Sequence, residues 1–379
     1  MPSDRPLNIL HVFRAPVGGL FRHVLDLSRG QIERGHRVGL IADSQTGGAR
    51  AEAALAELGP RLALGLTRIK MRRAPGPLDF FAVAHVNRRI RDSEADVTHG
   101  HGAKGGAFAR LAFWRCPTVR AYTPHGGSLW YEPGTLTGKI YLGTEKLLMR
   151  RGGLYLFESE YSSNSFRRKI GTPPGVVRVI HNGVAAAEFA PVELAPDATD
   201  LLFLGEFRVL KGIDILIEAM ALLGAGGRKV TATLIGDGPD SAAIRAAVTR
   251  HVLNERVRFM PPMPVRQALA LGHVMVVPSR AESLPYVVLE AAAAGKPLLA
   301  SRVGGIPEIY GELADALVPP DDATALAKAI SASLDDPAAA AALAYRLRER
   351  VASGFSLDGM VEGVLEGYRA ALSAQHQNR

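Results

Sequence analysis

The chain has 379 residues, more than one ordinary hydrophobic core accommodates, so two domains of roughly 150 to 190 residues are expected. Hydrophobic residues make up 47% and charged residues 22% of the sequence, which is typical of a globular protein and excludes a disordered chain. The net charge of +8 favours an anionic partner, although nucleic acid, a membrane surface and a phosphorylated substrate all meet that description.

Several classes of protein are excluded by simple features of the sequence. The single cysteine, Cys116, excludes an internal disulfide and provides no cluster for zinc, and we expect it to be a small buried residue at a strand start. There is no apolar run of transmembrane length, and residues 1–6 are polar and lack a signal-peptide core, so the expected location is the cytoplasm. The basic residues form no aromatic-interleaved stripe, so nucleic acid is not an expected partner.

Short apolar runs alternate with helical patterns along the first half of the chain. We expect strands at residues 7–13, 38–42, 68–71, 97–99, 118–122, 154–157 and 176–180. Strands separated by helices predict a parallel sheet that is covered on both faces. The stretch 189–200 is rich in Pro, Ala and Asp and is the expected linker.

The same alternation restarts after this linker. Strands are expected at residues 201–204, 232–235, 257–260, 274–277, 297–300 and 316–318. Helices are expected from 322 to 351, and a last helix from 357 to 372. The sequence therefore predicts an α/β protein made of two doubly wound, Rossmann-like halves.

A pair of glycines, Gly18 and Gly19, lies between the first expected strand and the helix expected at residues 20–34. Glycines in this position let the backbone approach a ligand and leave N–H groups pointing at it. A simple tight turn would use the same pair. The glycines are therefore candidates for a ligand-binding loop.

The segment 100–105 has the spacing of a dinucleotide-binding fingerprint. That fingerprint requires an acidic residue about twenty positions further on, and the stretch around Arg120 has none. We interpret His99, His101 and Lys104 instead as a polar loop at the carboxyl end of a strand. The two histidines have no third metal ligand nearby in the sequence, so no metal site is expected.

His125 lies in another expected strand-end loop, followed by two glycines. An imidazole there can move a proton or bind a polar substrate group, and a structural role is equally compatible with the sequence. The helix expected at residues 137–151 carries apolar and basic side chains together. Such a helix either lies on an anionic membrane or is half-buried in the protein.

The second half has a basic loop at residues 205–212, between a strand and a helix. Arg208 and Lys211 beside a helix start form a suitable clamp for a diphosphate, although a solvated basic loop is the plainer interpretation. Gly236 and Gly238 end the next strand and allow close backbone approach. A further glycine loop follows at residues 304–308.

The most informative stretch is 281–290, which contains Glu282 and Glu290 around a loop and a helix start. Two carboxylates at this spacing suit the binding of sugar hydroxyls, although acids that are solvated or cap the helix would look the same. The backbone N–H groups of Leu284, Tyr286 and Val287 would face an anion such as a phosphate. Open α/β sheets bind their ligands at this edge.

Taken in this order, the segments resemble the retaining family 4 glycosyltransferases, which have the two-domain GT-B fold with a central cleft. The resemblance covers nearly the whole chain and is carried by the Glu-x7-Glu motif and the glycine loops at 205–212, 236–239 and 304–308. It implies an acceptor-binding domain at 1–190, a donor-binding domain at 191–355 and, at 356–379, a helix that crosses back to the first domain.

The resemblance also implies roles for particular residues. Lys211 would neutralise the donor diphosphate, Glu282 would orient the donor sugar and Glu290 would bind the ribose. Arg208 would replace an arginine that many members have where this chain has Glu206. The other implied contacts are Gly18, Gly19, Gly236, Gly238, Ser283, Leu284, Pro285 and Tyr286 for the donor, His125 for the transferred sugar, and His99, His101 and Lys104 for the acceptor.

The implied activity is transfer of a sugar, with retention of configuration, from a nucleotide sugar to a glycan or lipid-linked acceptor in cell-surface polysaccharide or glycolipid synthesis. No Asp-x-Asp motif occurs in the chain, so no metal or other cofactor is expected. An anionic membrane surface is a further candidate partner, at the inner face of the membrane. The alternatives are an NAD-dependent oxidoreductase that uses segment 100–105, and a non-catalytic membrane-surface adaptor on the same fold.

Overall fold

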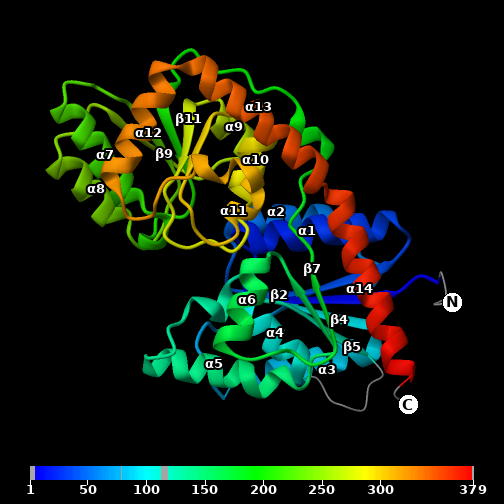
Figure 1. Cartoon of the computed structure of the whole chain (residues 1–379). Coiled ribbons are helices and arrows are strands. Elements are labelled where there is room, and N and C mark those ends of the chain that lie inside the picture. Colours follow the sequence, from blue (N-terminus) through cyan, green and yellow to red (C-terminus); the bar gives the residue numbers. More distant parts are fainter. Residues whose placement is uncertain (1–4, 78, 112–117, 378–379) are drawn as a thin grey trace. The chain divides into compact units, whose positions relative to one another are not determined.

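The computed structural model describes residues 5–77, 79–111 and 118–377, which form two compact α/β units (Figure 1). Unit 1 comprises the described parts of Met1–Asn182 and Leu357–Arg379, and unit 2 is Gly183–Ser356. The first division therefore follows Asn182, before the stretch 189–200 that was expected to be the linker. Cys116 lies outside the described residues.

Within the described residues, the sheet of unit 1 has seven parallel strands in the order β3-β2-β1-β4-β5-β6-β7. The strands are β1 Asn8–Phe13, β2 Arg37–Asp43, β3 Leu66–Ile69, β4 Val97–His101, β5 Val119–Thr123, β6 Leu154–Phe157 and β7 Val176–Val179. Chain order reverses where β1 lies beside β4, so their carboxyl ends form a topological switch point, where such sheets bind ligands.

Helices cover this sheet, as the alternating pattern predicted (Figure 1). They are α1 Gly18–Glu33, α2 Gly48–Leu58, α3 Asp79–Asp92, α4 Gly102–Leu111, α5 Leu136–Met149, α6 Glu160–Lys169 and α14 Leu357–Gln377, with short 3-10 turns η1 Gly59–Arg61 and η2 Gly127–Trp130. The last helix, α14, contacts α1 and strands β5, β6 and β7. A Cβ on Gly30 would lie 2.5 Å from Val361 Cγ2, so glycine permits the close approach of α1 and α14.

The sheet of unit 2 has five described strands, all parallel, in the order β10-β9-β8-β11-β12. They are β8 Thr199–Leu204, β9 Ala232–Ile235, β10 Val257–Met260, β11 Gly272–Val277 and β12 Leu298–Ala300. The switch point lies between β8 and β11, so the loops after these two strands meet there. The strand expected at 316–318 is wrong, because η5 Gly311–Ala316 occupies its start and Val318 makes only an isolated bridge with Ser301.

The helices and 3-10 turns of unit 2 include η3 Ala186–Phe189, η4 Val209–Lys211, α7 Ile213–Ala225, α8 Ser241–Arg250, α9 Val265–Leu269, α10 Tyr286–Ala293, α11 Ile306–Tyr310, α12 Ala323–Asp335 and α13 Pro337–Gly354. Most of these helices are short, and the three longest are α7, α12 and α13. Asp336 separates α12 from α13 and accepts a hydrogen bond from Ala339 N at 2.8 Å, and Pro337 begins α13. This cap and proline divide the region expected to be helical from 322 to 351.

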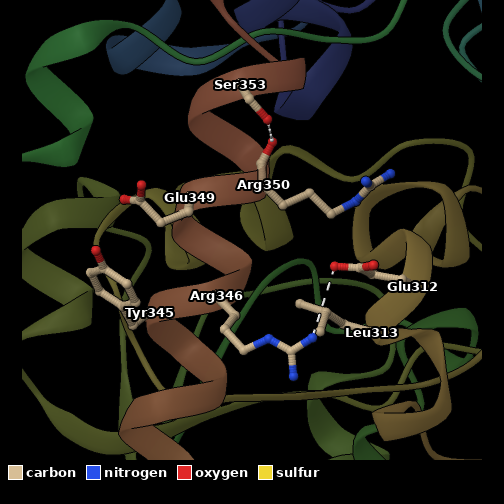
Figure 2. Close-up of a pocket in the computed structure, with 7 residues that line it drawn as sticks. All are labelled: Glu312, Leu313, Tyr345, Arg346, Glu349, Arg350 and Ser353. Carbon is tan, nitrogen blue, oxygen red and sulfur yellow. Dashed lines mark hydrogen bonds and ion pairs between the residues drawn. The ribbon is translucent and has the colours of Figure 1, made fainter.

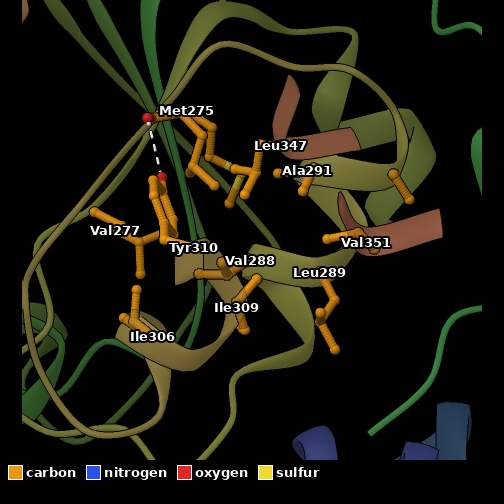
Figure 3. Packing of buried hydrophobic residues seen from close by; sticks show 14 of the residues in the cluster. Met275, Val277, Val288, Leu289, Ala291, Ile306, Ile309, Tyr310, Leu347 and Val351 are labelled. Atoms are coloured by element: carbon orange, nitrogen blue, oxygen red, sulfur yellow. Dashed lines mark hydrogen bonds between the residues drawn. The ribbon is translucent and has the colours of Figure 1, made fainter. Parts of the chain in front are cut away.

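Helix α10 is fixed by burial rather than by helix propensity. Seven of its residues are buried: Tyr286, Val288, Leu289, Glu290, Ala291, Ala292 and Ala293. Figure 3 shows Val288, Leu289 and Ala291 packed among side chains of β11, α11 and α13. Full burial of each valine or leucine contributes about 1.5–3 kcal/mol, so this short helix has one stable position against the sheet. That position determines where Glu290 lies.

Candidate active site

The loops at the switch point of unit 2 bring Lys211 and Glu282 together. Lys211 ends η4, which follows β8, and Glu282 lies in the loop after β11. Lys211 Nζ donates to Glu282 Oε1 at 2.6 Å, and Ser279 Oγ donates to the same oxygen at 2.7 Å. Residues 71 positions apart in the sequence thus form one site.

This site is only partly open to solvent. The Glu282 side chain is 10% exposed and that of Lys211 is 28% exposed. An ammonium in this position can neutralise an anion, while the carboxylate can accept hydrogen bonds from hydroxyl groups. Sequence reasoning missed Ser279, because a serine just after a buried strand is common and its partner is known only from the fold.

Arg208 does not stand alone as a cation, since its Nη2 donates to Glu206 Oε1 at 2.8 Å. Glu206, at the position where the resemblance expects arginine, therefore balances the charge of Arg208. Arg280, which sequence reasoning also missed, holds the same loop. It donates to Val209 O at 2.6 Å and to both carboxylate oxygens of Asp214, a pairing that raises the pKa of Arg280.

The glycines of this region are required by loop packing. A Cβ on Gly236 would lie 1.9 Å from Gly205 O, and one on Gly238 would lie 2.4 Å from Phe207 O. Gly304, with φ of +58°, would place a Cβ 1.6 Å from Glu282 O. The glycines therefore allow the loop after β9 to approach the loop after β8, and the loop after β12 to approach the loop after β11. The donor contact predicted for Gly236 and Gly238 stays a prediction.

The loop 283–286 leads into α10, with Pro285 as its N-cap residue in an extended conformation. The side chains of Leu284 and Tyr286 are buried, and Ser283 O accepts a hydrogen bond from Gly305 N at 2.8 Å. Glu290 lies in the second turn of α10 and is 8% exposed. The structure thus places both acids of the Glu-x7-Glu motif on buried scaffold at the same sheet edge.

In unit 1, Gly18 and Gly19 form the first turn of α1 rather than a loop before it. Gly18 has φ of +62°, a left-handed conformation that favours glycine, and a Cβ there would meet no atom within 4 Å. This open helix start follows β1 at the switch point of the sheet. A ligand role for the two glycines stays a prediction.

The interpretation of His101 and Lys104 as part of a polar loop is wrong, whereas His99 lies in β4 as the strand expected at 97–99 predicted. His99 and His101 belong to β4, where parallel pairing on both sides buries them completely, and Lys104 belongs to α4. His99 Nδ1 bonds to the Tyr368 hydroxyl at 2.7 Å and its Nε2 to Thr123 Oγ1 at 2.8 Å. The acceptor contact predicted for His99 therefore has no accessible ring nitrogen in this structure.

Lys104 forms an ion pair with Asp79. Its Nζ donates to Asp79 Oδ2 at 2.6 Å and to Ala74 O at 3.2 Å. The ammonium therefore ties α4 to the start of α3, and the predicted acceptor contact is untested.

His125 follows β5 and has φ of +50°, a left-handed conformation that is uncommon for residues other than glycine. Gly126 and Gly127, which follow it, also have positive φ. His125 Nε2 lies 3.0 Å from His101 Nδ1, and burial lowers the pKa of His125 well below 6.5. A neutral ring can donate and accept a hydrogen bond, so it suits the binding of a hydroxyl.

The structure brings together histidines that lie far apart in the sequence. Ring nitrogens of His11, His99 and His101 lie within 4.8 Å of one another, as do those of His23, His101 and His125. The nitrogens of His11 and His101 already bond to one another at 2.9 Å. Sequence reasoning missed His11 and His23, although a histidine inside a buried strand such as β1 is itself a signal.

A separate pocket of about 400 Å³ lies in unit 2 against α13 (Figure 2). It is lined by Glu312, Leu313, Tyr345, Arg346, Glu349, Arg350 and Ser353. None of the predicted site residues belongs to this lining. Arg350 donates to two carbonyls of α11, those of Glu308 and Ile309, so it braces the helix.

The two Rossmann-like units form the two-domain fold of the GT-B glycosyltransferases. The profile of the "Glycosyltransferase Family 4" matches residues 17–188, and that of the "Glycosyl transferases group 1" matches residues 198–336. The chain therefore belongs to the family 4, group 1 glycosyltransferases.

Relatives are similar to this protein along most of the chain. A glycogen synthase of Mycobacterium tuberculosis is 28% identical, over 95% of this chain and 93% of the relative. A D-inositol 3-phosphate glycosyltransferase of Saccharomonospora viridis is 29% identical, over 74% of this chain and 71% of the relative. These similarities support glycosyl transfer as the activity.

Solved structures share the fold. HepE of Anabaena, in a complex with UDP-glucose, has a TM-score of 0.78 at 20% identity and covers 95% of this chain and 98% of its own. A sucrose-phosphate synthase of Thermosynechococcus elongatus has a TM-score of 0.77 at 24% identity, covering 98% of this chain and 100% of its own. Among the described residues, no helix is both long and apolar enough to cross a bilayer.

These findings favour a glycosyltransferase over the NAD-dependent oxidoreductase that segment 100–105 had suggested as an alternative. In the fingerprint-like segment, a Cβ on Gly105 would lie 2.3 Å from Val12 O, and one on Gly100 would lie 2.6 Å from Gly105 O. The two glycines thus let α4 pack tightly on β1 and β4. Helix and strand packing accounts for the motif without a dinucleotide.

Proposed function

We propose that this protein transfers a sugar, with retention of configuration, from a nucleoside diphosphate sugar bound at the switch point of unit 2. The observation that carries the proposal is the contact of Lys211 Nζ with Glu282 Oε1 at 2.6 Å. This contact supports the proposal because it sets an ammonium, which can neutralise a diphosphate, beside a carboxylate, which can accept from sugar hydroxyls, at the edge where an open α/β sheet binds ligands. Glu290, in the adjacent helix, would bind the ribose hydroxyls.

The proposed transfer breaks the bond between C1 of the sugar and the phosphate oxygen. A hydroxyl oxygen of the acceptor bonds to C1 on the same face, and its proton passes to the departing phosphate oxygen. Negative charge grows on the diphosphate during this step, so Lys211 and Arg208 stabilise the transition state. Because the chain has no Asp-x-Asp motif, we assign the role of a metal ion to these side chains.

Similarity to the Anabaena protein supports a nucleotide sugar as donor, since HepE was solved with UDP-glucose. A relative from Arabidopsis thaliana, 25% identical over 87% of this chain, is a subunit of a phosphatidylinositol N-acetylglucosaminyltransferase. We therefore propose a glycan or lipid-linked acceptor, in the synthesis of cell-surface polysaccharide or glycolipid. The intact Lys211 and Glu282 pair speaks against a non-catalytic adaptor.

A thermal-shift screen tests this proposal, because a ligand that binds only the folded protein raises its melting temperature. The screen uses UDP, GDP and ADP with their glucose or mannose conjugates, each with and without EDTA, and NAD as the comparison. We expect one nucleotide series to stabilise the chain with EDTA present. Stabilisation by NAD alone, or by no nucleotide sugar, would overturn the proposal.

We further propose that α5 lies on an anionic membrane, where a lipid-linked acceptor would be found. Thr135 caps this helix by accepting from Gly138 N at 2.9 Å. Leu136, Ile140 and Leu147 of α5 are 77%, 53% and 73% exposed. The helix also carries the exposed Lys139 and Lys146, and the exposed Arg150 is its C-cap residue. Exposed apolar residues flanked by cations are typical of a helix in the membrane interface.

Flotation with vesicles that contain phosphatidylserine tests the membrane proposal. Each cation contributes about 1 kcal/mol near an anionic surface, so Lys139→Glu with Lys146→Glu, which removes two cations and adds two repelled anions, should weaken binding by at least roughly thirtyfold. Lys328→Glu, an exposed change in α12 of unit 2, is the control and should bind normally. Equal binding of all three proteins would remove the proposal.

A further inference from the structure

Five histidines meet around the carboxyl ends of the central strands of unit 1. His11 lies in β1 and faces His99 of β4 in register, while His101 follows two residues later on the same face of β4. His23 of α1 and His125 after β5 complete the group. Neighbouring rings in this group have centroids 3.9 to 5.7 Å apart, so the five imidazoles pack against one another.

Three of these imidazoles form a continuous hydrogen-bonded row that begins at Gln31. Gln31 Oε1 lies 2.9 Å from His11 Nε2, and His11 Nδ1 lies 2.9 Å from His101 Nε2. His101 Nδ1 lies 3.0 Å from His125 Nε2. Gln31, His11 and His101 are buried, and His125 is partly buried at the end of the row.

The rings in this row are neutral at physiological pH. Burial lowers the pKa of His11 to about 4, and it lowers the pKa values of His101 and His125 well below 6.5. A neutral imidazole has one N–H donor and one bare nitrogen that accepts. The direction of one hydrogen bond in the row therefore determines all the others.

Gln31 sets that direction, because its carbonyl oxygen can only accept. His11 must then carry its proton on Nε2, which leaves Nδ1 to accept from His101 Nε2. His101 Nδ1 in turn accepts from His125 Nε2. His125 therefore holds its proton on Nε2, and its Nδ1 is a bare acceptor.

A second set of hydrogen bonds fits the same amide orientation. Gln31 Nε2 donates to the Tyr368 hydroxyl at 3.5 Å, and that hydroxyl lies 2.7 Å from His99 Nδ1. His99 Nε2 then donates to Thr123 Oγ1 at 2.8 Å. Both sets thus have a consistent polarity when the carbonyl oxygen of Gln31 faces His11.

We propose that Gln31, acting through His11 and His101, fixes His125 in the tautomer whose Nδ1 accepts a hydrogen bond from a hydroxyl of the bound sugar. Gln31, His11 and His101 are positioning residues, since they act only through His125. The inference rests on the proposed function, because it takes the ligand of His125 to be a sugar. It gives His125 a role in selecting a hydroxyl, with no proton transfer and no charge.

The first experiment measures the tautomer directly in the full chain labelled with ¹⁵N at its histidine rings. Nuclear magnetic resonance distinguishes the protonated ring nitrogen from the bare one. We expect His125, assigned by loss of its signals in His125→Asn, to carry its proton on Nε2. A proton on Nδ1, or a transition metal bound to these rings in stoichiometric amount, would overturn the proposal.

The second experiment changes the start of the row. Gln31→Met keeps a similar volume but removes the acceptor, so His125 should become a mixture of tautomers. Gln31→Glu retains an acceptor and should restore the single tautomer. Tyr368→Phe is the matched control, because it breaks the other set of hydrogen bonds and should leave His125 unchanged.

Turnover is followed as release of UDP from UDP-glucose, or from the nucleotide sugar that stabilises the protein most. Loss of one hydrogen bond to the sugar predicts a fall of about tenfold in kcat/KM for Gln31→Met, with unchanged affinity for UDP. Gln31→Glu should recover most of it. If Gln31→Met fails to fold, the wild-type tautomer together with the activity of Gln31→Glu and Tyr368→Phe decides.

Failure of this inference differs from failure of the proposed function. If no nucleotide sugar binds the wild-type protein, the proposed function fails, whatever the tautomer of His125. If a nucleotide sugar binds and turns over but Gln31→Met keeps both the tautomer and the rate, only the role of Gln31 is refuted.

Discussion

Lowering the pH from about 7 to about 5 should strongly destabilise unit 1. Burial lowers the pKa values of His11 and His23 from 6.5 to about 4 in the folded protein. The unfolded chain therefore takes up protons first as the pH falls. The stabilisation is fully present above pH 6.5, is lost between 6.5 and about 4, and changes no further below that.

The magnitude follows from this difference in pKa. One pKa unit corresponds to about 1.36 kcal/mol, so each of the two rings lowers the free energy of unfolding at pH 5 by about 2 kcal/mol relative to pH 7. Together His11 and His23 cost about 4 kcal/mol, a large part of the roughly 5–15 kcal/mol that stabilises a typical domain. The pKa values of His99, His101 and His125 are lowered in the same direction and add to this loss.

Urea unfolding followed by tryptophan fluorescence is the assay. Both tryptophans, Trp114 and Trp130, lie in the unit 1 part of the sequence, so the signal reports that unit. His11→Gln should reduce the dependence of the unfolding free energy on pH by about 1.4 kcal/mol per pH unit. His85→Gln, which changes an exposed ring, is the control. A flat stability between pH 7 and 5, or equal slopes in wild type and His11→Gln, would refute the reasoning.

Two further predictions concern packing and a buried charge. Gly304→Ala should lower the free energy of unfolding by about 1–3 kcal/mol more than Gly227→Ala does. Both glycines have positive φ, but a Cβ on Gly304 would clash with Glu282 O, whereas one on Gly227 would meet no atom within 4 Å. Differential scanning calorimetry compares the two variants, and equal melting temperatures would contradict the prediction. Glu145→Ala leaves the fully buried Arg110 without its carboxylate at 2.7 Å, so unit 1 should lose about 3–5 kcal/mol in urea unfolding. A loss below about 1 kcal/mol would show that the ion pair is unimportant.

The sequence predicted most of the fold because parallel strands and their covering helices have strong apolar patterns. The strands at 154–157, 232–235 and 257–260 match the structure in both bounds. The strand predicted at 316–318 was wrong, because within this short run only Val318 pairs with a neighbouring segment, through one isolated bridge to Ser301. The strand expected at 97–99 continues to His101 in β4, so the loop expected at His101 is wrong, and both neighbours of β4 in the sheet bury that histidine.

The candidate site was predictable only where one segment contains the signal. Lys211 and Glu282 were found through their local glycine loops and helix starts, and the fold brings them together. Ser279 and Arg280 were missed because their importance depends on partners on other loops. The row from Gln31 to His125 was also invisible, since it forms only when β1 pairs with β4 and α1 packs beside them.

The central claim is that Lys211 binds the diphosphate and Glu282 the sugar of one donor. Isothermal titration with UDP and UDP-glucose, or with the pair that stabilises the protein most, tests it in Lys211→Met and Glu282→Gln. We predict that Lys211→Met weakens both ligands by at least about tenfold, whereas Glu282→Gln weakens only the nucleotide sugar. Arg228→Met, which removes a surface ion pair of unit 2, should bind as wild type does. Unchanged affinity for both ligands in both site variants would contradict the account.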